Sequence, residues 1–169
     1  GSYYASAKEL VGADIELPYP SVGATENIIL AASLAKGATT LRNGALEPEI
    51  INLIQMLNAM GAHIEVKENE RAIIIEGVKA LRGVRAHVPP DRNEVVSIAC
   101  AALATSGDVV VPDVPARDLS AFLKKVEEIG AHDEVKTRGI RFWGKTPYKP
   151  TAIVTSPHPG FMTDWQQPF

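Results

Sequence analysis

The spacing of apolar residues predicts two amphipathic helices, each with one buried face. Apolar side chains recur at positions i, i+3, i+4 and i+7, a spacing that places them on one side of a helix. They are Ile50, Leu53, Ile54, Leu57 and Met60 in the first helix, and Leu119, Phe122, Leu123, Val126 and Ile129 in the second. Gly-Ala follows each pattern and predicts the end of each helix.

Two further predicted helices are apolar on nearly all sides. They lie at residues 25–36 and 93–106. The first has no charged residue between Glu26 and Lys36, and the second has none between Glu94 and Asp108. Because a helix at a protein surface shows a polar face, we expect both helices to be enclosed, with the sheets outside them.

Short stretches rich in β-branched and aromatic residues predict strands between the helices. They lie at residues 14–17, 39–41, 63–66, 72–76, 85–88, 108–111 and 140–143. The tripeptide Gly-Ala-His at residues 61–63 recurs 69 residues later, at 130–132, together with the apolar pattern before it. The order β-α-β-α-β-β therefore occurs twice, over about 70 residues each time. This order predicts an α/β (α+β) fold built from repeats.

The repeat predicts two complete units and the beginning of a third. The first unit spans residues 3–88, the second 89–150 and the third 151–169, with a strand at 152–155 and a helix that begins near Thr163 and Asp164. We interpret the unfinished third unit as a sign that the chain is a segment of a longer protein, with Gly1-Ser2 as the remnant of an expression vector. Because an incomplete repeat leaves apolar faces uncovered, we expect homo-oligomerisation or domain swapping through them.

Composition narrows the classes of partner. The net charge is −3, with acidic and basic residues interspersed, so we expect no nucleic-acid partner. No apolar run approaches the ~20 residues of a membrane span, and we expect a cytoplasmic protein with no membrane partner. The four histidines lack the spacing of metal ligands, which predicts no metal site. Cys100 has no basic neighbour in sequence and is predicted to be a core thiol.

Three polar or glycine-containing turns lie directly before predicted helices. Two precede the apolar helices, and the third precedes the helix that would begin in the third unit. They lie at residues 21–27, 91–94 and 160–164. Ser, Thr and Asp are good helix N-caps, and the unpaired backbone N–H groups of a first turn can hold a phosphate. Capping alone would explain each turn separately. Their equivalent positions in the repeat lead us to predict a binding cleft.

Four motifs, in this order and spacing, resemble the UDP-N-acetylglucosamine enolpyruvyl transferase family. They are Pro20-Ser21-Val22-Gly23-Ala24-Thr25-Glu26-Asn27, Glu47-Pro48-Glu49-Ile50, Pro90-Asp91-Arg92 and Pro159-Gly160-Phe161-X-Thr163-Asp164-X-Gln166. The related enolpyruvyl-shikimate-phosphate synthases share the repeats but lack the first of these motifs. The resemblance implies an inside-out α/β barrel of two lobes, with the active site between them. The chain would cover under half of such an enzyme, with one unit from each lobe.

The resemblance also implies a reaction. The family transfers the enolpyruvyl group of phosphoenolpyruvate to the 3'-hydroxyl of UDP-N-acetylglucosamine and releases phosphate, through a tetrahedral addition intermediate. This is the first committed step of peptidoglycan precursor synthesis. The implied partners are therefore UDP-N-acetylglucosamine and, in the complete enzyme, phosphoenolpyruvate. No metal or organic cofactor is implied.

Site residues follow from the same resemblance. Asp164 matches the aspartate beside the sugar hydroxyl and would accept its proton, with Thr163 next to it. The turn that holds the nucleotide diphosphate is matched by Ser21, Val22 and Gly23, and further cleft positions are matched by Glu47, Glu49, Asp91 and Arg92. The reactive cysteine of the family, which Cys100 does not match, and its phosphoenolpyruvate-binding cations fall outside this chain. The chain alone is therefore predicted to be inactive.

Two departures from the motifs leave alternatives open. After Asp-Arg the family usually has Ile-Glu-Ala-Gly, where this chain has Asn-Glu-Val-Val at residues 93–96, and Pro-Thr-Asp-Met is replaced by Met-Thr-Asp-Trp at 162–165. The wider Val95 and Trp165 could reshape the cleft of a paralogue that uses another acceptor. A non-catalytic repeat module is a second alternative. An RNA-end-processing relative is a third, against which the absence of a basic face argues.

Overall fold

The computed structural model describes residue 2 and residues 4–169. Gly1, part of the predicted vector remnant, and Tyr3, the predicted start of the first unit, lie outside the described residues. The chain forms two compact units: unit 1 ends at His87, and unit 2 begins at Val88 and continues to Phe169. Residues 151–169 are therefore part of unit 2. No helix within the described residues has both the length and the apolar character needed to cross a membrane.

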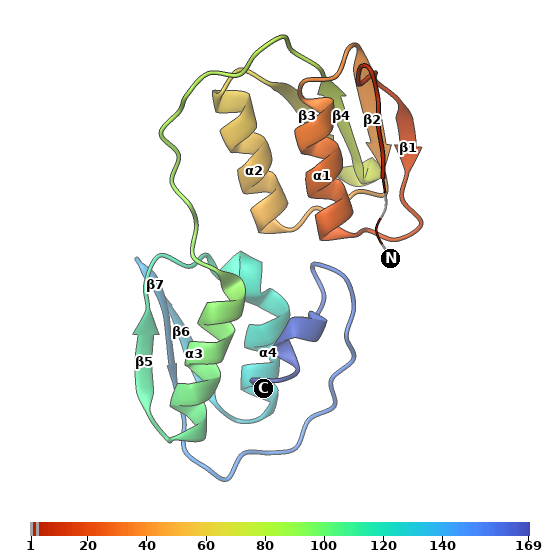
Figure 1. Cartoon of the computed structure of the whole chain (residues 1–169). Helices are drawn as coiled ribbons and strands as arrows, with labels where there is room; N and C mark the ends of the chain where they lie inside the picture. The colour runs from red at the N-terminus through yellow and green to blue at the C-terminus, as the bar shows by residue number, and fades with distance from the viewer. Residues whose placement is uncertain (1, 3) are drawn as a thin grey trace. The chain divides into compact units, whose positions relative to one another are not determined.

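Unit 1 is a four-stranded sheet with two helices on one face (Figure 1). Its elements are β1 (Asp14–Glu16), α1 (Val22–Ala32), β2 (Ala38–Arg42), α2 (Pro48–Ala59), β3 (His63–Lys67), the 3-10 turn η1 (Glu68–Glu70) and β4 (Ala72–Glu76). The strand order is β1-β2-β4-β3, in which β1 and β2 are parallel and the other neighbours are antiparallel. Both helices bury their apolar stripes against this sheet.

Unit 2 repeats most of this arrangement (Figure 1). Its elements are α3 (Arg92–Ala104), β5 (Asp108–Val111), the 3-10 turn η2 (Ala116–Leu119), α4 (Ser120–Glu128), β6 (His132–Lys136), β7 (Gly139–Trp143) and the 3-10 turn η3 (Thr163–Trp165). The antiparallel order β5-β7-β6 reproduces the order β2-β4-β3 of unit 1. The repeat predicted from sequence is therefore present in the structure, without a counterpart of β1 in unit 2.

The two amphipathic helices end in the same way. Gly61 and Gly130 have φ values of 105° and 83°, in the left-handed region that glycine adopts without strain. The N–H of Ala62 donates to the carbonyl of Leu57 at 2.9 Å, and the N–H of Ala131 donates to that of Val126 at 3.0 Å. These are the bonds of a Schellman motif, which satisfies the last carbonyls of a helix.

Two of the predicted strands are wrong. Residues 85–88 and 152–155 form no strand, although Thr155 makes an isolated bridge to Phe161. A strand exists through its hydrogen-bonded partner, and no neighbouring strand pairs with either segment. Pro89 and Pro90 also restrict the backbone directly after the first of them. In contrast, β6 is present where the repeated order requires a strand, although no residue range was predicted for it.

The apolar helices are less enclosed than predicted. In α1, Ile29 is fully buried, but Leu30 is 51% exposed. In α3, Val96 is fully buried, but Ile98 is 46% exposed. Each unit supplies one sheet, and a sheet covers only one side of a helix. The opposite side of each apolar helix is therefore open in this chain.

Candidate functional site

The turn at the start of α1 is built around a cap and a buried threonine. Ser21 is the N-cap, and its Oγ accepts a hydrogen bond from the N–H of Ala24 at 3.3 Å. The hydroxyl of Thr25, which is fully buried, donates to the carbonyl of Ser21 at 2.8 Å. Helix geometry leaves the N–H groups of Val22 and Gly23 without a carbonyl partner inside the helix. The first turn contains no acidic side chain, so these N–H groups can serve an anion.

Gly23 has no structural reason to be glycine. A Cβ added to it would meet nothing within 4 Å, and its φ lies outside the left-handed region. Alanine is a better helix former than glycine by about 1 kcal/mol, so the fold alone favours alanine at this position. Glycine is also the residue that lets a ligand approach the backbone closely. The exposed Gly23 therefore indicates a site of close approach.

Glu47 and Glu49 lie at the start of α2, at the same end of unit 1. The parallel strands β1 and β2 lead into α1 and α2, so both helices begin beyond the carboxyl ends of these strands (Figure 1). In open α/β sheets this edge is where ligands bind. Glu47 is only 5% exposed, and its Oε2 has no hydrogen-bond partner among the described residues. Glu49 lies in the first turn, where a carboxylate stabilises the helix dipole.

A hydrogen-bond chain connects these two helix starts. The hydroxyl of Thr25 accepts a hydrogen bond from the N–H of Ala45 at 2.9 Å while it donates to the carbonyl of Ser21. Ala45 is fully buried and lies two residues before Glu47. One hydroxyl group therefore fixes the loop before α2 against the first turn of α1. Thr25 belongs to the first motif, but the sequence alone does not indicate this role.

In unit 2, four predicted residues come together at the start of α3. Asp91 is the N-cap, and its carboxylate accepts a hydrogen bond from the N–H of Asn93 at 2.7 Å. Arg92 is only 5% exposed, and its guanidinium carbon lies 5.7 Å from the ring centroid of Trp165. That tryptophan ends η3, whose first two residues, Thr163 and Asp164, are both exposed. The start of α3 therefore lies against the turn that carries the predicted proton acceptor.

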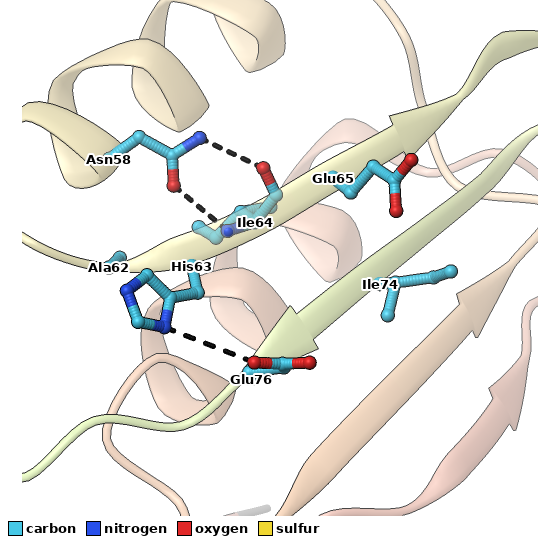
Figure 2. A pocket seen from close by; sticks show the side chains of 7 residues that line it. All are labelled: Asn58, Ala62, His63, Ile64, Glu65, Ile74 and Glu76. Atoms are coloured by element: carbon cyan, nitrogen blue, oxygen red, sulfur yellow. Dashed lines mark hydrogen bonds and ion pairs between the residues drawn. The ribbon is translucent and has the colours of Figure 1, made fainter.

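A separate hollow of about 390 Å³ lies beside the β3–β4 hairpin of unit 1 (Figure 2). His63 Nδ1 and Glu76 Oε2 are 3.9 Å apart there, with side chains 69% and 71% exposed. An exposed ion pair of this kind stabilises a fold by about 0–1 kcal/mol. Within the described residues no three His, Cys, Asp or Glu side chains are grouped so as to hold a metal ion. The hollow contains no predicted site residue and is not the candidate site.

Comparison with known proteins identifies the family. Residues 2–169 match the sequence family described as EPSP synthase (3-phosphoshikimate 1-carboxyvinyltransferase). The chain belongs to this family. It is 44% identical to the UDP-N-acetylglucosamine 1-carboxyvinyltransferase of Protochlamydia amoebophila (strain UWE25), over 100% of this chain and 37% of that protein. It is 43% identical to UDP-N-acetylglucosamine 1-carboxyvinyltransferase 1 of Staphylococcus aureus (strain MRSA252), over 98% of this chain and 39% of that protein.

An enolpyruvyl transferase and an EPSP synthase of known structure share the fold. The enolpyruvyl transferase NikO from Streptomyces tendae superposes with a TM-score of 0.82 at 23% identity, over 95% of this chain and 41% of that one. EPSP synthase from Acinetobacter baumannii superposes with a TM-score of 0.58 at 21% identity, over 80% of this chain and 32% of that one. The resemblance and the fold class predicted from the motifs are confirmed. The chain spans about two fifths of the length of the curated relatives it matches.

Within this family member, Cys100 is a packing residue. It lies in the core of unit 2, and burial raises the pKa of its thiol from 9.0 to about 11. The thiolate is the nucleophile, so a raised pKa makes the group unreactive at neutral pH.

We expect iodoacetamide to leave Cys100 unmodified in the folded protein at mildly alkaline pH and to alkylate it completely in denaturant. Intact mass measurement of both samples checks this. Equal alkylation rates in the two samples would show that the thiol is accessible and would contradict its assignment to the core.

The side chains that suggested a different acceptor are buried. Val95 and Trp165 are each 2% exposed, so neither presents a surface to a ligand. The expectation that they reshape a cleft by direct contact with the acceptor therefore loses its basis.

Proposed function

We propose that this chain carries acceptor-binding residues of a UDP-N-acetylglucosamine 1-carboxyvinyltransferase that acts in peptidoglycan precursor synthesis in the cytoplasm. The N–H groups of Val22 and Gly23 hold the nucleotide diphosphate, because they are oriented N–H groups at a helix start without an adjacent acid, and Ser21 contributes as the N-cap that orders this turn. Thr163 and Asp164 contact the sugar. The exposed carboxylate of Asp164 accepts the proton of the 3'-hydroxyl as its oxygen adds to phosphoenolpyruvate. The methylene carbon of phosphoenolpyruvate takes up a proton in this addition, from an acid that the proposal places outside this chain. It loses a proton again as phosphate leaves the tetrahedral adduct, which restores the double bond.

Glu47 and Glu49 of unit 1 and Asp91 and Arg92 of unit 2 are the further substrate-binding residues of the proposal. The buried guanidinium of Arg92 presents N–H groups suited to a carboxylate or phosphate. The buried carboxylate of Glu47 is suited to accept hydrogen bonds from hydroxyl groups. The proposal calls for no metal or organic cofactor. Gly23 is the observation that carries it, because the fold gives no reason for a glycine there and a diphosphate does.

We expect UDP-N-acetylglucosamine and UDP to shift the backbone amide resonances of Ser21, Val22 and Gly23. Only the sugar nucleotide should also shift those of Thr163 and Asp164. Gly23→Ala should weaken UDP binding by about tenfold, equivalent to 1.4 kcal/mol, while the melting temperature stays the same or rises. NMR titration and thermal unfolding of both proteins provide the measurements.

Gly83→Ala is the matched control. Its Cβ also meets nothing within 4 Å, and Gly83 lies outside the proposed site. UDP affinity should therefore not change in this variant. Equal UDP affinity of wild type and Gly23→Ala would contradict the diphosphate site. Binding of UDP without any preference for the N-acetylglucosamine moiety would instead point to another acceptor.

A further inference from the structure

Two of the positions at which the chain departs from the family motifs, Asn93 and Trp165, contact each other. The indole N–H of Trp165 donates a hydrogen bond to the Oδ1 of Asn93 at 2.9 Å, although the residues are 72 positions apart in the sequence. Asn93 lies in the first turn of α3, and Trp165 ends η3. The substituted residues therefore form one structural feature that joins two elements.

The hydrogen bond satisfies a group that would otherwise be buried without a partner. Trp165 is 2% exposed and packs edge-on against Phe161 and Phe122, with ring centroids 5.4 Å and 6.1 Å away. A buried indole N–H without an acceptor is strongly unfavourable. Asn93 supplies that acceptor. Its backbone is in turn fixed by the cap of Asp91, which accepts from its N–H at 2.7 Å.

The same ring also contacts Arg92. The guanidinium carbon lies 5.7 Å from the ring centroid of Trp165, within the range of a cation–π interaction. Trp165 thus contacts two consecutive residues of α3 through different parts of its side chain. Asp164 directly precedes Trp165 in η3, so its backbone position follows from how the tryptophan is held.

We infer that Asn93 and Trp165 are positioning residues that hold the Thr163–Asp164 turn against the start of α3. This inference rests on the proposed role of that turn in binding the acceptor sugar. Asp164 stays exposed while its neighbour is anchored in the core, so the carboxylate is held without being covered. An apolar pair at the two positions could fill space but could not set the direction of η3 by a hydrogen bond.

The first test needs no ligand and compares Asn93→Leu with Asn93→Asp. Leucine removes the acceptor at similar size, whereas aspartate keeps an oxygen acceptor. We expect the indole N–H of Trp165 and the amide of Gln166 to exchange about tenfold faster in Asn93→Leu and to stay near the wild-type rate in Asn93→Asp. The amides of Ala99 and Leu103 in α3 should be unchanged in both. Unchanged exchange at Trp165 in Asn93→Leu would overturn the inference.

The second test separates positioning from general destabilisation. Asn93→Leu should weaken binding of UDP-N-acetylglucosamine by about fivefold, while UDP affinity changes by less than about twofold. Asn93→Asp should restore the preference for UDP-N-acetylglucosamine over UDP. Equal weakening of both ligands, or of neither, would overturn the inference. If the wild type binds neither ligand, the proposed function fails, and hydrogen exchange alone decides whether Asn93 and Trp165 hold η3.

Discussion

Phe122→Ala is expected to lower the free energy of unfolding of unit 2 by about 3–5 kcal/mol. Phe122 is fully buried on α4. The centroid of its ring lies 6.0 Å from that of Phe142, 6.1 Å from that of Trp165 and 5.8 Å from that of Phe169. Truncation removes the side chain at the centre of this aromatic cluster and leaves a cavity that rigid rings cannot fill. One wall around Trp165 is lost, so η3 should also become less ordered.

Tryptophan fluorescence during chemical denaturation measures this change in unit 2 alone, because the two tryptophans, Trp143 and Trp165, both lie in unit 2. Phe122→Leu is the control and should lower the free energy of unfolding of unit 2 by less than about 1.5 kcal/mol, since leucine keeps most of the apolar volume. Amide exchange in β2 and β4 should be unaffected by either variant. A loss below about 1.5 kcal/mol for Phe122→Ala would mean that the aromatic cluster is not the core of unit 2.

Helices and their order could be predicted from the sequence because they depend on local periodicity. The stripe from Ile50 to Met60 and the glycine stop at Gly61 belong to one continuous segment, and so do their counterparts in unit 2. The repeat then fixed the succession of elements. Its 69-residue offset from His63 to His132 also places β6 at the position of β3, although composition alone does not indicate a strand there because only Val135 is apolar.

The wrong strands show what local propensity cannot supply. Residues 85–88 and 152–155 have strand-like composition, but a strand needs a neighbouring backbone to pair with. In contrast, β6 has a polar sequence and is a strand because each of its residues pairs with β7. Pairing is a property of the assembled sheet, so composition indicated two strands that do not form and failed to indicate one that does.

The features of the candidate site also differ in whether they depend on local sequence or on contacts between distant segments. Turns such as Ser21 to Gly23 could be predicted, because capping and oriented N–H groups are local features of a helix start. The contact between Asn93 and Trp165 joins distant segments, and each residue alone signalled only a departure from a motif. The buried hydroxyl of Thr25 was likewise invisible, since a threonine near a helix start is usually explained by capping.

Thr25→Val is expected to lower the free energy of unfolding of unit 1 by about 1–3 kcal/mol, although valine has nearly the same shape. The fully buried hydroxyl donates to the carbonyl of Ser21 at 2.8 Å and accepts from the N–H of Ala45 at 2.9 Å. Valine leaves the buried N–H of Ala45 without a partner, and it also breaks the connection between the starts of α1 and α2. UDP affinity should therefore fall with stability, by about fivefold.

Thr25→Ser separates the contribution of the hydroxyl group from that of the methyl group. Serine keeps both hydrogen bonds and loses one buried methyl group. The free energy of unfolding should therefore fall by about 0.8 kcal/mol, and UDP affinity should stay close to that of the wild type. Chemical denaturation and UDP titration of the three proteins give the comparison. Equal losses of UDP affinity in the two variants would mean that packing of the methyl group, rather than the hydroxyl bridge, orders the turn at Ser21. Loss of UDP affinity in Thr25→Val alone would mean that one buried hydroxyl group fixes the turn at Ser21 against the loop before Glu47.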